Sequence, residues 1–325
     1  MKSTLLFDYA KKRLHSALYP EYFCDSICKL LAVFDRFNVT SKEMWFEVHY
    51  NKCIDFIMEV EDILSLKPLC DYLASTLPTE AAEAWTYIRE KIKDIETKPN
   101  LFPKYMHVVS LEFDMEEIMS ERYCPCIFFE FDVEQMRIDH TDRYNIYRLF
   151  DNAILPEYCR FAGEVTNNKT VENLLSDGFE LWNIGFMMSR KEYPRVFSVP
   201  LDYEKANYFL LNLHADQLVS EIESGSHDKK DYLIDFDIEG SECNNIGVII
   251  YAKFFKERMG YISSLVENRV ITAEEASAIE DWNHKEFVVI EDKKKLVVYQ
   301  VSHNKLKNGK NNAKPKIYLR IKEWE

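Results

Sequence analysis

The chain has 325 residues, of which 47% are hydrophobic and 14% aromatic, so it can bury a large core. Its formal net charge of -14 argues against nucleic acid as the main partner, because backbone phosphates need a basic surface. No run of about 18 apolar residues is present, and Asp8 interrupts the apolar stretch near the N-terminus, so the sequence predicts neither a membrane span nor a secretory signal.

The cysteines give no sign of a metal site or a disulfide framework. Eight are scattered through the chain, and the closest spacings join Cys24 to Cys28 and Cys124 to Cys126. Neither pair is followed by a second Cys or His pair at the spacing of a zinc site. Buried free thiols in a reducing compartment are the simpler interpretation, so we expect a cytoplasmic protein.

Taken in order, the chain alternates helical stretches with pairs of strand-like segments. A helical pattern over residues 4–36 precedes a hairpin with the strands MWFEVHY and CIDFIMEVE. A second helical stretch over residues 63–97 precedes a hairpin from His107 to Val133, with the strands HVVSLEFDM and CPCIFFEFDV. Helices followed by a hairpin are therefore the first two units of the chain.

The same order recurs three more times. Residues 137–180 precede WNIGFMMSR and RVFSVPL, and residues 203–224 precede DYLIDFDI and NIGVIIYAKF. Residues 255–283 precede the last pair, KLVVYQVSHNKLK and KPKIYLRIKEW. The units recur at a spacing of roughly 50 to 70 residues and no Gly/Ser/Pro-rich linker interrupts them, so we predict one domain over residues 1–325.

Polar and apolar side chains alternate along these strands. In the second hairpin Leu111 and Phe113 face one side of the sheet, and the carboxylates that follow each of them face the other. If the apolar faces meet the helices, the polar faces line a wet interior. The residues on that predicted interior face are Glu47, Glu112, Asp114, Glu130, Asp235, Asp237, Lys316, Tyr318 and Arg320.

Five hairpins give ten antiparallel strands, about the number at which a twisted sheet curls or closes. The sequence therefore predicts an α+β fold in which five ααββ repeats close a ten-stranded antiparallel β-barrel ringed by helices. An open α+β sheet with one face in water explains the alternation equally well, and it remains an alternative at this point.

Several short motifs resemble a known family. NIGFMMSRKEYPRVFSVP resembles the third hairpin of the cyanobactin-type peptide prenyltransferases, KIYLRIKEW resembles their closing strand, and WFEVHYN resembles their first-hairpin Y-E-V-x-N motif. The repeated ααββ order is the plan of the wider class of ABBA-type (PT-barrel) prenyltransferases. LEFD, SHxKL and KxYL are similar to segments of proteins encoded beside lanthipeptide synthetases. The prenyltransferase resemblance implies a transferase that moves an isoprenoid from an allylic diphosphate onto a peptide or small aromatic acceptor.

A leaving diphosphate needs cationic and hydroxyl donors. The pair Lys316-x-Tyr318 matches the K-x-Y pairs that hold diphosphate in the family. A lysine in water beside a tyrosine packed between strands is the simpler alternative. The candidate diphosphate-binding residues, all in or next to predicted strands, are Arg195, Tyr251, Lys253, Lys305, Lys316 and Tyr318.

The resemblance also implies a catalytic carboxylate and an aromatic wall. Glu47 stands at the position of the family's catalytic Glu, which acts on the acceptor proton and the allylic cation. Without the resemblance, a single Glu on a strand is more often exposed. Aromatic rings stabilise a carbocation by cation-π attraction. The candidates for this wall are Trp45, Phe128, Phe197 and Tyr299.

Acidic residues are more numerous than a cationic diphosphate pocket requires. Glu112, Asp114, Asp235 and Asp237 are candidates to hold Mg²⁺ that bridges to the diphosphate. The same carboxylates alternatively pair with Lys and Arg across the interior or bind a cationic substrate. A non-catalytic protein that captures a peptide in the barrel, or along a strand edge, is therefore the second functional hypothesis.

Overall fold

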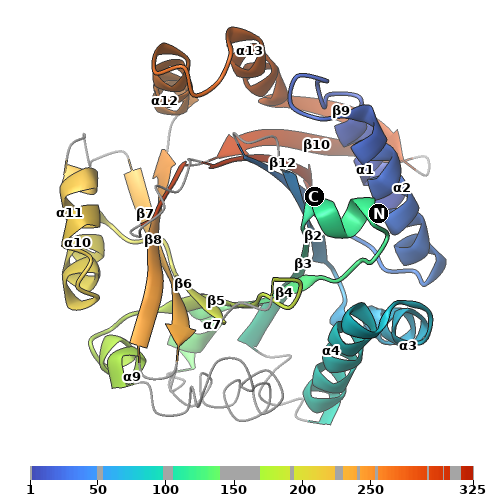
Figure 1. Ribbon diagram of the computed structural model, residues 1–325, viewed down its shortest axis with the longest axis horizontal. Helices are drawn as coiled ribbons and strands as arrows, with labels where there is room; N and C mark the ends of the chain where they lie inside the picture. The colour runs from blue at the N-terminus through green and yellow to red at the C-terminus, as the bar shows by residue number, and fades with distance from the viewer. Residues whose placement is uncertain are drawn as a thin grey trace.

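The computed structural model describes residues 2–49, 54–97, 105–139, 169–190, 194–223, 230–239, 242–252, 255–290, 293–302, 304–307 and 316–324. These residues form an α+β protein with one antiparallel sheet of twelve strands. Figure 1 shows the sheet curled so that its strands follow one another around a ring, with the helices outside it. None of the described helices is long and apolar enough to cross a membrane.

Neighbouring strands in sequence are neighbours in the sheet for most of its width. The order is β11-β8-β7-β6-β5-β4-β3-β2-β1-β12-β10-β9. The strands are β1 (Glu43–His49), β2 (Ile54–Val60), β3 (Met106–Phe113), β4 (Cys126–Phe131), β5 (Leu181–Phe186), β6 (Arg195–Ser198), β7 (Lys230–Glu239), β8 (Glu242–Ala252), β9 (His284–Ile290), β10 (Lys293–Ser302), β11 (Asn304–Lys307) and β12 (Lys316–Trp324).

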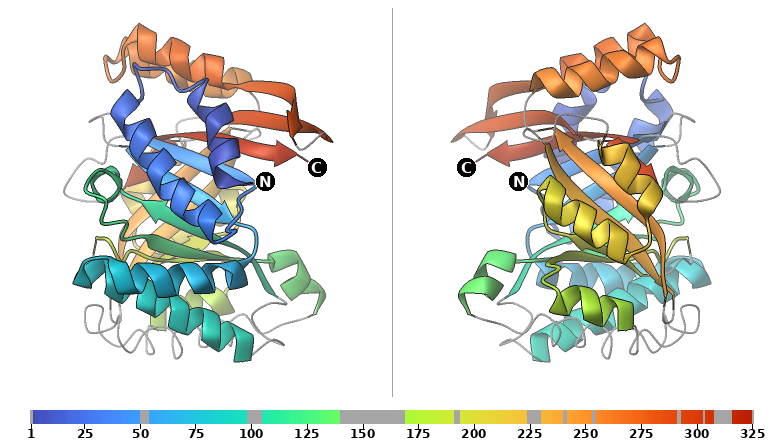
Figure 2. Two further views of the ribbon diagram at one scale, coloured as in Figure 1. Left: turned by 90° about the vertical axis from the view of Figure 1, so that its right-hand side faces the viewer. Right: turned by 90° about the vertical axis from the view of Figure 1, so that its left-hand side faces the viewer.

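Helix pairs cover successive parts of the outer face, as the side views in Figure 2 show. They are α1 (Ser3–Lys11) with α2 (Glu21–Arg36), α3 (Leu66–Thr76) with α4 (Thr79–Thr97), α10 (Tyr203–Asn212) with α11 (Asp216–Glu223), and α12 (Phe255–Glu267) with α13 (Ala273–Trp282). Shorter helical segments are η1 (Ile63–Ser65), α6 (Met115–Met119), α7 (Val133–Ile138) and α9 (Lys169–Ser176). Most of the predicted helical stretch over 137–180 lies outside the described residues.

All five predicted hairpins are present, but the sheet has twelve strands instead of ten. The first strand of the fifth hairpin is described in two parts, β10 and β11, on either side of His303, which lies outside the described residues. β9, which pairs with β10, is not among the predicted strands. Val288 is buried between the exposed Phe287 and Val289, and because all three are apolar the sequence of β9 lacks the polar–apolar alternation that identifies the other strands.

The main core lies between the sheet and the helices. On β12 the side chains of Ile317, Leu319 and Ile321 are buried on this outer side, as the alternation predicts. Phe46 of β1 packs against Trp282 of α13, with ring centroids 5.8 Å apart. Burying such side chains stabilises the fold by about 1.5–3 kcal/mol each. The opposite faces of the same strands must therefore carry the polar residues.

Candidate functional site

Glu47 lies at the centre of the candidate site, on the inner face of β1. Antiparallel pairing with β12 places Glu47 opposite Tyr318. Two residues further along β1, His49 is opposite Lys316. The Glu47 side chain is only 4% exposed and forms an ion pair with the ammonium group of Lys316. Tyr318 hydrogen-bonds to the same carboxylate. The predicted catalytic residue and two predicted diphosphate-binding residues are thus brought together.

The electrostatics of this group follow from its burial. Burial alone would lower the pKa of Lys316, but Glu47, Glu112 and Asp55 outweigh it and raise that pKa above its ordinary value. Burial raises the pKa of Tyr318, and the Glu47 charge raises it further. Lys316 is therefore charged and Tyr318 neutral near pH 7, so both are hydrogen-bond donors.

Three carboxylates beside this group share one guanidinium. Atoms of Asp55, Glu112 and Asp114 that could bind a metal lie within 4.8 Å of one another. Nη2 of Arg190 donates to Asp55 at 3.1 Å and to Glu112 at 2.5 Å, and Nε donates to Asp114 at 2.9 Å. Ser189 Oγ donates to the second Asp114 oxygen at 2.8 Å. We call Asp55, Glu112 and Asp114 the acidic triad.

Burial has a large effect on the pKa of Glu112, one member of the acidic triad. It raises the pKa of Glu112 to about 7, against the opposing effect of Arg190, and the Glu47 and Asp55 charges contribute to the rise. A carboxylate with this pKa is partly protonated near neutral pH. Any cation that binds the acidic triad would favour its charged form, since opposite charge lowers the pKa of a carboxyl group.

A second ion-pair group lies on β6 and β7. Arg195 is opposite Asp237, and its Nε donates to a carboxylate oxygen of Asp237 at 2.6 Å. Asp235 lies 3.9 Å from the same guanidinium, and Asn245 donates to Asp237 at 2.7 Å. The predicted metal ligands are therefore divided: Glu112 and Asp114 join Asp55 in the acidic triad, whereas Asp235 and Asp237 are counter-ions of Arg195.

A third group lies toward the other end of β1 and β12. Arg320 and Lys322 both contact the buried carboxylate of Glu43, at 2.5 and 3.2 Å. The guanidinium of Arg320 also lies over the ring of Trp45, 4.6 Å from its centroid. Trp45 in turn meets Tyr318 edge to face, with centroids 6.3 Å apart. Trp45 therefore lies on the inner face, as predicted, but a cation already covers its ring.

Apolar side chains form a separate inner cluster. Phe128 of β4 and Phe197 of β6 are 6.1 Å apart between centroids, and both pack with Cys126 and Met187. The cluster is distinct from the main core between sheet and helices. Two members of the predicted aromatic wall are therefore in contact on the inner face.

The structure places Tyr299 on the other side of the sheet, so the prediction that it lines the interior needs correction. Tyr299 is opposite Ile321, on the outer face of β10, and packs edge to face on Trp282 at 5.4 Å. Its hydroxyl donates to Glu286 at 2.7 Å. Tyr299 alternates in phase with the buried Val297 and Val301, a pattern that already indicates the apolar face.

Three predicted diphosphate-binding residues have no described side chain. Lys253 lies outside the described residues, and only the backbone of Tyr251 in β8 and of Lys305 in β11 is described. By register Lys305 is opposite Ile249. Asp55 and Arg190 are not among the predicted site residues. Asp55 was accessible, because it is opposite Glu47 in the first hairpin, but nothing in the sequence indicates that Arg190 reaches across from the third hairpin.

The described inner face carries more negative than positive charge. Its carboxylates include Glu43, Glu47, Asp55, Glu59, Glu112, Asp114, Glu130, Asp235 and Asp237, against the cations Arg190, Arg195, Lys316, Arg320 and Lys322. Each of these five cations contacts at least one carboxylate. A cation, or an anion that brings its own metal ion, therefore fits this interior better than a bare anion does.

Comparison of the sequence with protein-family models gives no match, and comparison with curated protein sequences gives no significant match.

Proposed function

We propose that the chain transfers an isoprenoid group from an allylic diphosphate to a peptide or small aromatic acceptor on the inner face of the sheet. The observation that carries this proposal is the buried Glu47, which Lys316 and Tyr318 contact from one side while the acidic triad lies on the other. One carboxylate is thus placed among donors suited to a phosphate group and oxygens suited to a metal ion.

We further propose that the curled sheet closes into a barrel. β10 pairs with β12, and β11, separated from β10 by one residue, pairs with β8 at the far end of the strand order. In a closed barrel, β10 and β11 together join the two sides, and β9 is an additional strand beside β10. Closure gives the inner face a defined volume from which bulk water is excluded.

The acidic triad fits Mg²⁺, because hard divalent cations prefer carboxylate oxygens. Arg190 shows that these three carboxylates hold a positive charge. A metal ion would compete with Arg190 for the same oxygens. Bound Mg²⁺ would neutralise charge on the diphosphate, which the described cations do not supply in excess.

In the proposed reaction, the bond between the allylic carbon and the diphosphate oxygen breaks, and the diphosphate leaves with the electron pair. Lys316 and Tyr318 donate hydrogen bonds to it. The acceptor atom forms the new bond to the allylic carbon and loses its proton to Glu47. Phe128 and Phe197 offer ring faces that stabilise the allylic cation.

A second candidate function is supported by one observation, the excess of negative charge on the inner face. Because Arg190, Arg195, Lys316, Arg320 and Lys322 are each already paired to a carboxylate, the interior is suited to a cationic group such as an arginine side chain of a peptide. In this case the protein binds and presents a peptide without transferring an isoprenoid.

Calorimetric titration with dimethylallyl diphosphate, with and without Mg²⁺, separates these candidates. The transferase proposal predicts binding that requires Mg²⁺ and weakens about tenfold or more in Glu112→Gln, because one metal ligand loses its charge. The exposed Glu280→Gln on α13 is the matched control and should bind as the wild type does. Binding of acetyl-arginine amide without Mg²⁺, together with no binding of the diphosphate, would favour the second candidate.

A further inference from the structure

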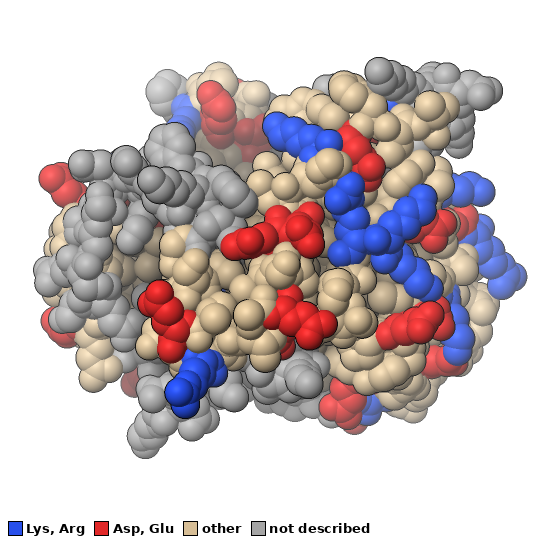
Figure 3. All heavy atoms as spheres, turned by 90° about the horizontal axis from the view of Figure 1, so that it is seen from above, with Lys and Arg blue, Asp and Glu red and all other residues tan. Residues whose placement is uncertain are grey.

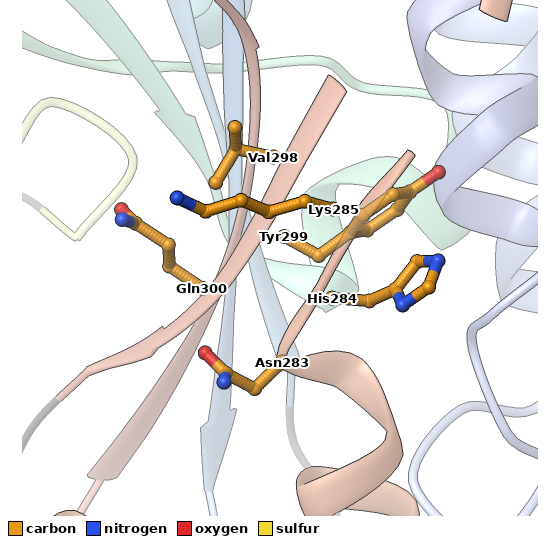
Figure 4. Close-up of a pocket in the computed structure, with 6 residues that line it drawn as sticks. All are labelled: Asn283, His284, Lys285, Val298, Tyr299 and Gln300. Atoms are coloured by element: carbon orange, nitrogen blue, oxygen red, sulfur yellow. The ribbon is translucent and has the colours of Figure 1, made fainter. Parts of the chain in front are cut away.

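An open pocket of about 390 Å³ lies where β9 begins, outside the candidate site. Its lining residues are Asn283, His284, Lys285, Val298, Tyr299 and Gln300. Figure 4 shows the side-chain ends of Lys285 and Gln300 pointing to the same side of the two strands, whereas His284 and Tyr299 point to the opposite side. The register agrees, because Lys285 is opposite Val298 and His284 is opposite Tyr299.

Two polar side chains of this pocket, Lys285 and Gln300, can donate hydrogen bonds into it. Lys285 has no ion-pair or hydrogen-bond partner within the part of the chain that the structure describes, and its side chain is exposed. Gln300 Oε1 accepts a hydrogen bond from Arg320 at 3.3 Å, which leaves its amide nitrogen as the group available to the pocket. No carboxylate is among the six lining residues. Together these groups favour an anion.

Two cations lie next to the pocket on the side to which Lys285 points, although the whole chain has a net charge of -14. Arg320 contacts Gln300 and Lys322 is opposite Val298, and the two share the carboxylate of Glu43. Arg13 lies over the ring of Tyr299 on the opposite side of the strands and pairs with Glu286. Figure 3 shows the molecule from above, with Lys and Arg side chains gathered in one region and Asp and Glu side chains beside them. An anion held by Lys285 would therefore lie near positive charge that the Glu43 carboxylate only partly offsets.

Apolar side chains continue from the pocket along β9. Phe287 and Val289 share the face of Lys285, since they follow it at two-residue steps on the same strand. They are 64% and 70% exposed, although large apolar side chains are usually covered. Val298 supplies a buried apolar wall inside the pocket itself. A ligand that is anionic at one end and apolar at the other would satisfy both parts of this surface.

We propose that this pocket binds a small organic oxyanion with an apolar body, its anionic group held by Lys285 and the Gln300 amide. The apolar body lies against Val298 and Phe287. A carboxylate and a phosphate monoester offer the same acceptor chemistry. The site is separate from the one formed by Glu47 and the acidic triad, so the proposal does not depend on isoprenoid transfer.

Titration of ¹⁵N-labelled protein followed by two-dimensional NMR tests the proposal. The probes are sodium acetate, hexanoate and hexyl phosphate, with sodium chloride at equal ionic strength as the reference. We expect shifts at residues 283–285 and 298–300 for all three oxyanions, and tighter binding of hexanoate than of acetate because more apolar surface is buried. Comparing hexanoate with hexyl phosphate identifies the preferred oxyanion.

Variants decide whether the residues act as proposed. Lys285→Met should weaken hexanoate binding about tenfold or more, Lys285→Arg should restore it, and Phe287→Ser should remove the advantage of hexanoate over acetate. Lys205→Met, which removes an exposed lysine on α10, is the control for overall charge. Shifts that match those of chloride, or hexanoate binding that survives Lys285→Met unchanged, would overturn the proposal.

Discussion

Glu47 and Lys316 have different roles in the proposed reaction, so their replacement should have different effects. Lys316→Met removes a donor to the diphosphate and should raise the dissociation constant of dimethylallyl diphosphate about tenfold or more. Glu47→Gln removes the proton acceptor while keeping its shape. It should leave donor binding within about threefold and lower kcat about 100-fold. Calorimetry and single-turnover kinetics measure the two effects separately.

Stability must be measured beside these variants, because either substitution leaves the other charge buried without its partner. Removing one member of a buried ion pair commonly costs about 3–5 kcal/mol. The double variant Glu47→Gln with Lys316→Met removes both charges and should recover most of that loss without recovering activity. If Glu47→Gln only lowers the midpoint of unfolding and leaves kcat unchanged in the folded fraction, Glu47 has no catalytic role.

The half-buried carboxylate of Glu59 predicts a pH dependence of stability. Burial raises the pKa of Glu59 from 4.5 to about 7, and the charges of Glu43 and Glu130 add to the rise. The folded chain therefore binds more protons than the unfolded chain between these pH values. The stabilisation is fully present below pH 4.5 and is lost as pH rises through about 7.

Glu59→Gln removes this titration, so the variant should lose less stability than the wild type between pH 5 and pH 7.5. The difference should be about 1–3 kcal/mol, since one pKa unit corresponds to about 1.4 kcal/mol. Denaturant unfolding at a series of pH values measures it. If the free energy of unfolding changes with pH in the same way in both proteins, folding does not raise the pKa of Glu59.

At the scale of single residues, alternation along a strand was the most reliable guide in the sequence. It placed Glu47, Lys316 and Tyr318 on one face, and the structure places their side chains in contact. The same alternation puts Tyr299 in phase with the buried Val297 and Val301, on the opposite face. Arg190 could not be found this way, because its contacts join residues more than 70 positions apart in the chain.

At the scale of elements, the close approach of β4 and β5 depends on one glycine. A Cβ added at Gly185 would lie 2.3 Å from the ring of Phe128, far inside van der Waals contact. Gly185→Ala should therefore displace this ring and destabilise the protein by about 1–3 kcal/mol. In a Phe128→Ala background the same change should cost much less, since the clash is absent.

A double-mutant cycle by denaturant unfolding measures this coupling. Gly260→Ala, at a helical position where an added Cβ meets nothing within 4 Å, is the matched control. The Gly260 change should be neutral or slightly stabilising, because alanine is the better helix former. Equal costs for Gly185→Ala with and without Phe128 would contradict the packing described for the inner apolar cluster.

At the scale of elements, the sequence predicts most of the strands and helices. The five hairpins follow from period-two alternation, and the helices before them follow from apolar residues at helical spacing. β9 is not predicted, because the exposed Phe287 and Val289 flank the buried Val288 and leave three consecutive apolar residues in the sequence. Patterns that report burial cannot identify a strand that buries only one side chain completely.

At the scale of the whole molecule, local sequence patterns predict which strands pair within a hairpin, but they do not predict whether the sheet closes. Each hairpin predicts its own pairing, whereas the contact of β8 with β11 joins segments about 50 residues apart. The same limit applies to the acidic triad, which gathers oxygens from β2, from β3 and from the residue after β3. The functional proposal depends on this long-range arrangement more than on any single motif.

The most direct test of the proposed function is a crystal structure with Mn²⁺ and dimethylallyl thiolodiphosphate, a slowly reacting analogue of the donor. Mn²⁺ stands in for Mg²⁺ and is located by its anomalous scattering. We predict an anomalous peak at the oxygens of Asp55, Glu112 and Asp114, a displaced Arg190, and the diphosphate against Lys316. A structure in which Arg190 still holds the three carboxylates and the analogue is absent from the inner face would contradict the proposed function.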